Sequence, residues 1–128
     1  MNRAADWLRQ AESDLRAAED SAKAGHHEWT VFQAQQSAEK AVKALAQSSH
    51  GAVRGHVIPE ILRRLPSSAT VPDSLLDAAL ALDRVYVAPR YRNAFSWGSP
   101  SNYFNERSSR EYIDDARQVL EFCRSQIH

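Results

Sequence analysis

The sequence FQAQQSAEKAVKAL, at residues 32–45, contains neither glycine nor proline. Together with the preceding valine it carries small apolar residues every three or four positions, which is the period of an α-helix and not of a strand. This stripe comprises Val31, Ala34, Ala38, Ala41 and Leu45. Small side chains let two helix axes approach closely. The pattern therefore predicts a helix over about residues 28–47 that packs tightly against a neighbour.

Four other segments around this helix are also helical in pattern. They cover residues 4–23, residues 56–65, the stretch from Pro72 toward Pro89, and residues 105–126. Asp73 or Ser74 is suited to capping the fourth helix, and Ser108 with Glu111 resembles a capping box in the last. No segment alternates with period two. We predict an all-α fold, an up-and-down four-helix bundle with one short extra helix, in a single domain of residues 1–128.

The composition excludes several classes of protein. With 43% hydrophobic and 25% charged residues, the 128-residue chain is neither disordered nor a membrane protein, since no uncharged run approaches the ~20 residues that span a bilayer. The amino terminus has no apolar signal-peptide core. Cys123 is the only cysteine, so an intramolecular disulfide is impossible and a cytoplasmic location is expected. Its apolar register predicts a small core residue.

The charge is unevenly distributed along the chain. Formal net charge is zero, which argues against a general nucleic-acid-binding polycation. The stretch from Arg84 to Arg110, however, contains five arginines and a single acidic residue, Glu106. A local basic region of this kind attracts phosphate groups even on a neutral protein.

This basic region includes an aromatic loop, predicted over residues 89–104, that carries Arg90 and Arg92. A guanidinium group pairs with phosphate or carboxylate through the same planar fork, so two roles remain open. The arginines either contact a phosphate or RNA, or bond to helix carbonyls or to Glu39. The loop aromatics either stack on bases or pack in the core or in a dimer interface.

Polar residues on the helix of residues 28–47 are the second group of candidates. Gln36 and Lys40, like Glu39 and Lys43, are four residues apart and suit a solvated face. Alternatively, Gln36 and Glu39 are partly buried and need partners, for which the loop arginines are candidates. No Glu-x-x-His pair, phosphate-binding glycine loop or nucleophile elbow occurs. We therefore expect no metal, no cofactor and no catalytic residue of a common type.

Taken in order, four segments resemble one family. They are Trp7-Leu8-Arg9-Gln10-Ala11, VFQAQQSAEKAVKAL at residues 31–45, the short helix opened by His56, and RVYVAPRYRNAF at residues 84–95. This order is similar to the HEPN family (higher eukaryotes and prokaryotes nucleotide-binding domain) over nearly the whole chain. The resemblance implies a four-helix bundle that is usually a homodimer. It also implies, for many relatives, a minimal nucleotidyltransferase partner in a prokaryotic toxin–antitoxin-like pair.

The ribonuclease branch of that family uses an arginine followed after a few residues by a histidine. Here Trp97 stands where the histidine belongs, and an indole cannot act as a general acid or base. The chain instead resembles a branch with Arg-Tyr-Pro-Asp/Asn-Ala. Arg90, Tyr91 and Asn93 match it, whereas Arg92 occupies the proline position and leaves open which arginine faces a ligand.

We therefore expect a non-catalytic, homodimeric protein that binds nucleotide or RNA and works with a separate minimal nucleotidyltransferase. The expected contacts are Arg90, Tyr91, Arg92 and Asn93, supported by Gln36, Glu39, Lys40, Lys43 and His56. One alternative is a metal-independent endoribonuclease toxin in which His56 transfers the proton. Another is a module that only dimerises and binds a protein.

Overall fold

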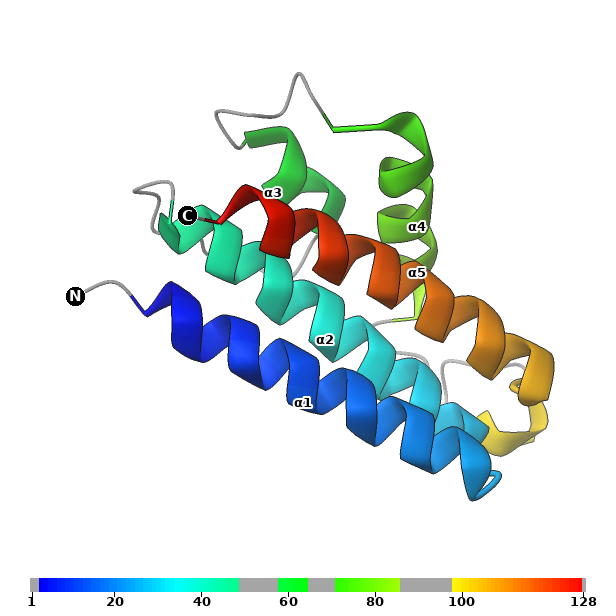
Figure 1. Ribbon diagram of the computed structural model, residues 1–128. Helices are drawn as coiled ribbons and strands as arrows, with labels where there is room; N and C mark the ends of the chain where they lie inside the picture. Colours follow the sequence, from blue (N-terminus) through cyan, green and yellow to red (C-terminus); the bar gives the residue numbers. More distant parts are fainter. Residues whose placement is uncertain (1–2, 49–57, 65–70, 86–97, 128) are drawn as a thin grey trace.

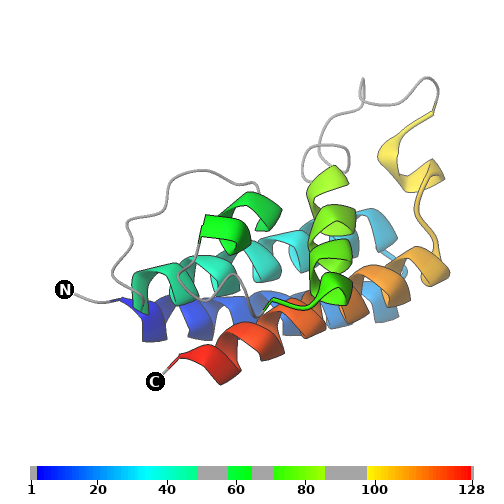
Figure 2. The same ribbon diagram turned by 90° about the horizontal axis from the view of Figure 1, so that it is seen from above.

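The computed structural model describes residues 3–48, 58–64, 71–85 and 98–127, and this part of the chain consists of helices and short connections. The elements are α1 (Ala4–Lys23), α2 (His27–Ser48), α3 (Ile58–Arg64), α4 (Asp73–Arg84), the 3₁₀ helix η4 (Pro100–Asn102) and α5 (Glu106–Gln126). The predicted all-α bundle is confirmed. Helices α1, α2 and α5 lie side by side (Figure 1), and the shorter α4 is steeply inclined to them (Figure 2).

Helices α1 and α2 form a tight hairpin. Gly25 ends the first helix with φ +83°, a conformation that side chains disfavour and that glycine adopts freely. Along the interface the hydroxyl of Ser37 donates to the carbonyl oxygen of Ala11 at 2.6 Å, and that of Thr30 donates to the carbonyl oxygen of Ala18 at 3.0 Å. These close contacts depend on the small-residue stripe of α2, all of which is buried.

The core lies between α2 and the surrounding helices. Its largest wholly buried aliphatic residues include Leu45, Leu62 and Leu82, which come from three different helices. Cys123 of α5 is fully buried among them, and burial raises the pKa of its thiol to about 12. Its predicted role as a core residue is thereby confirmed. Throughout the described ranges, none of the helices combines the length and the hydropathy needed to cross a membrane.

The helix ends differ from the predicted ones in two places. At the start of α5 the capping box joins Asn105 to Ser108, while Glu111 pairs instead with Arg107 at 3.1 Å. Asn105 is the N-cap residue because its extended backbone and short amide side chain suit that position. At the start of α4 the N-cap is Pro72, and no side chain caps the helix.

Candidate functional site

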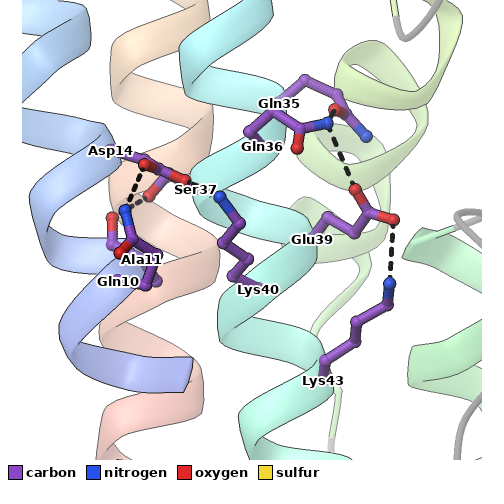
Figure 3. A network of polar contacts seen from close by, with 9 residues as sticks. All are labelled: Gln10, Ala11, Asp14, Gln35, Gln36, Ser37, Glu39, Lys40 and Lys43. Carbon is purple, nitrogen blue, oxygen red and sulfur yellow. Dashed lines mark hydrogen bonds and ion pairs between the residues drawn. The ribbon is translucent and has the colours of Figure 1, made fainter. Parts of the chain in front are cut away.

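Four polar side chains lie close together on α2, and we call Gln35, Gln36, Glu39 and Lys43 the polar row. Figure 3 shows them on the side of α2 away from the Asp14–Lys40 contact with α1. The amide nitrogen of Gln36 donates to Oε1 of Gln35 at 2.8 Å and to Oε2 of Glu39 at 3.3 Å. The predicted partial burial of Gln36 and Glu39 is confirmed, since Gln36 is half-buried and Glu39 is only 3% exposed.

Gln35 is the member of the row that the sequence did not single out. Its side chain is completely buried, and its Nε2 is a donor without a hydrogen-bond partner among the described residues. A buried donor in this condition costs folding free energy. The sequence feature that could have identified Gln35 is its position four residues before Glu39, which places both on the same side of the helix.

Lys43 joins the row to α1. Its Nζ lies 3.3 Å from Oε1 of Glu39, as the four-residue spacing predicts, and 5.7 Å from the centre of the Trp7 ring. An ammonium group over an aromatic face is attracted by the ring quadrupole. Lys43 is therefore held by a carboxylate from its own helix and by an aromatic ring from α1.

The end of α4 and the start of α3 lie beside the row. Burial raises the pKa of Asp83, and the nearby negative charge of Glu39 raises it further. The backbone N–H of Ile58 donates a hydrogen bond to the Asp83 carboxylate, which acts in the opposite direction and lowers the pKa. Asp83 thus brings the start of α3 and the end of α4 together next to Glu39. Asp83 was not recognisable as a site residue from the sequence, because this contact depends on how the helices pack.

Lys40 belongs to a different contact. Its Nζ pairs with Asp14 of α1, whose other carboxylate oxygen accepts from Gln10 at 2.9 Å (Figure 3). Within the described segments, Lys40 makes no hydrogen bond with Gln36. Lys40 therefore ties α2 to α1, and the structure does not bring it into the polar row.

Five of the predicted site residues lie outside the described residues: Arg90, Tyr91, Arg92, Asn93 and His56. Trp97 lies outside them as well. Their predicted roles stay predictions. The structure does describe the helix ends that lie next to these residues in the chain. Helix α3 begins at Ile58, two residues after His56, and α4 ends at Arg84, six residues before Arg90. Both ends adjoin the polar row through Asp83.

Several aromatic side chains lie outside the polar row. Trp29 meets Phe32 edge-on, with ring centres 6.3 Å apart, yet 49% of Trp29 is exposed. Tyr103 and Phe104 are half-buried. In the ranges that the structure describes, no group of three or more histidine, cysteine or acidic side chains is arranged to hold a metal ion.

Comparison with solved structures identifies close structural relatives. TT1696 from Thermus thermophilus is 37% identical and superposes with a TM-score of 0.95, covering 99% of this chain and 100% of that chain. ST0689, an archaeal HEPN homologue, is also 37% identical, with a TM-score of 0.85 and full coverage of both chains. The HEPN domain protein tm0613 from Thermotoga maritima is 31% identical over 94% of this chain and 95% of its own, with a TM-score of 0.74.

Sequence comparison agrees with these structures. "Putative toxin MJ1304" of Methanocaldococcus jannaschii is 29% identical over 125 residues, which is 90% of this chain and 82% of the relative. The family model for the HEPN domain matches residues 4–126, from the first turn of α1 to the last residue of α5. The chain belongs to the HEPN domain family.

Proposed function

We propose that this protein binds nucleotide or RNA without cleaving it, as a homodimer in a toxin–antitoxin-like pair with a separate minimal nucleotidyltransferase. One structural observation carries the proposal. A row of buried and half-buried amide, carboxylate and ammonium groups lies at the point where α3 begins and α4 ends. The segments that lead from these ends carry His56 and the Arg90–Asn93 sequence. The toxin name of the Methanocaldococcus jannaschii relative supports the pairing.

In this proposal the charged and polar side chains make different contacts with the ligand. Arg90 or Arg92 binds a phosphate through the guanidinium fork, and Asn93 and Tyr91 contact the rest of the ligand. Lys43 adds a second cation whose position is fixed by Glu39. Trp97 has no titrating proton, so no proton transfer follows and the bound phosphodiester stays intact.

Binding of fluorescein-labelled AMP and of a labelled RNA hexamer to the wild type and to Arg90→Ala/Arg92→Ala tests the proposal. We expect the double variant to bind at least tenfold more weakly, and the wild type to lose affinity as salt rises, because phosphate contacts displace counterions. The matched control is Arg107→Ala/Arg110→Ala, which removes two exposed arginines of the same basic region and should leave affinity within twofold.

Four outcomes contradict the proposal. Equal affinity of the wild type and Arg90→Ala/Arg92→Ala excludes the loop from binding. Cleavage of the hexamer in the presence of chelator, lost in His56→Ala, favours the endoribonuclease instead. A sedimentation-velocity mass of one chain at micromolar concentration excludes the homodimer, and a complex with the nucleotidyltransferase that forms only without nucleotide excludes joint action.

A further inference from the structure

A cavity on the first turns of α1 is not part of the site described above. It has a volume of about 350 Å³ and is lined by Arg3, Asp6, Trp7 and Gln10. That volume falls within the range of small-ligand pockets. The cavity is open to solvent, and one of its walls is the half-buried indole of Trp7.

The Trp7 ring is held in place from the α2 side. Lys43 lies over it at 5.7 Å, and Lys43 is itself paired with Glu39, whose side chain is 3% exposed. A ring fixed by such a chain of contacts loses little freedom when a second planar group stacks on it. The same contacts connect the cavity directly to the polar row.

The other lining residues supply complementary polar groups. Gln10 donates its amide nitrogen to Asp14 at 2.9 Å, and its carbonyl oxygen has no hydrogen bond within the described ranges. The Arg3 side chain is 65% exposed, and its Nε contacts Asp6 at 3.5 Å, which leaves further N–H donors for an anion. An aromatic plane, an acceptor and a guanidinium group therefore border one cavity, and the Asp6 carboxylate beside them is paired with Arg9 as well as with Arg3.

We propose that this cavity binds a nucleobase, stacked on Trp7, with its exocyclic amino group donating to Gln10 and the attached phosphate near Arg3. The inference rests on the proposed function and adds a second contact point for the same ligand class. Every base has a π-face, so stacking here tolerates different sequences. Adenine is the best first probe because it stacks strongly and carries an exocyclic amino group.

Fluorescence of Trp7 provides the test. In a Trp29→Phe/Trp97→Phe background Trp7 is the sole indole, and AMP and an adenosine hexanucleotide RNA are added separately. We expect both to quench the emission, and ribose 5-phosphate, which has the phosphate without the base, to leave it unchanged. Trp7→Leu in the otherwise wild-type chain should weaken binding about tenfold.

Controls separate stacking from folding. Trp29→Leu removes an exposed indole far from the cavity lining and should bind as the wild type does. Gln10→Ala, an exposed position, should weaken AMP binding about threefold with unchanged circular dichroism, and it keeps the test valid if Trp7→Leu does not fold. Quenching by the hexanucleotide but not by AMP supports the base site and identifies RNA as the source of the base.

The remaining outcomes distinguish this inference from the proposed function. The base site alone is overturned if binding requires Arg90 and Arg92 but does not change Trp7 emission. In that case Gln10→Ala should bind the probes with the same affinity as the wild type. Quenching by AMP that persists in Arg90→Ala/Arg92→Ala supports the base site and counts against the loop. No saturable binding of either probe by folded protein overturns both.

Discussion

Replacing Gln35 with methionine should stabilise the protein. Methionine is unbranched and close to glutamine in length, so it fills the same buried space. The substitution removes the Nε2 donor that has no partner in the described part of the chain, which relieves about 1–3 kcal/mol. It also removes the 2.8 Å acceptor of Gln36, a loss of about 1 kcal/mol, although Gln36 keeps its contact with Glu39.

The net gain is about 1 kcal/mol in the free energy of unfolding. For a chain of this size that corresponds to a rise of about 3–5 °C in Tm. Urea denaturation followed by circular dichroism measures the free energy of unfolding. An unchanged slope of this free energy against urea concentration would indicate that the folded and unfolded states are otherwise the same.

Two control variants bracket this result. Gln35→Glu keeps the acceptor of Gln36 but buries a second carboxyl group near Glu39, and should cost at least about 2 kcal/mol at pH 7. Gln36→Met removes both of its hydrogen bonds and should cost about 1 kcal/mol. A loss of more than about 1 kcal/mol in Gln35→Met would refute the reasoning, because it would mean that Nε2 is hydrogen-bonded in the folded protein.

Three further predictions concern the rest of the bundle. Burial, helped by neighbouring carboxylates, raises the pKa of Asp115 to about 6. Between about pH 4 and pH 6 the folded state therefore binds more protons than the unfolded state, and stability falls as pH rises through this range. Asp115→Asn should gain about 1 kcal/mol at pH 7, after allowing for solvent screening, and nothing at pH 3, as measured by Tm against pH. The buried Cys123 thiol should not react with dithionitrobenzoate at pH 8 until denaturant is added, and fast reaction of folded protein would contradict its place in the core. Ala38→Leu should cost about 1–3 kcal/mol by overpacking the core, whereas Ala5→Leu, at an exposed position of α1, should change stability by less than about 0.5 kcal/mol in the same denaturation assay.

Local features of the fold were predictable from sequence. The α1–α2 hairpin follows from the small-residue stripe and from Gly25, because both act through neighbours in the chain. The ion pair between Glu39 and Lys43 was predictable for the same reason, since residues four apart share one side of a helix.

Contacts between helices were not predictable in this way. Lys40 pairs with Asp14, 26 residues away, and Asp83 approaches Glu39 only because α4 ends beside α2. No sequence spacing specifies such pairs; the relative placement of the helices does. Gln35 and Trp7 were likewise not assigned to a site, because an amide or an indole in a helical pattern usually indicates packing.

Helix α2 contacts each of the other helices in the described part of the chain, and 12 of its 22 residues are buried. It cannot turn or slide without disturbing all of them. A molecule recognised by side chains on this helix therefore meets groups whose spacing is already set. The entropy lost on association falls mainly on the ligand, and rigid ligands of matching length should gain most in affinity over flexible ones.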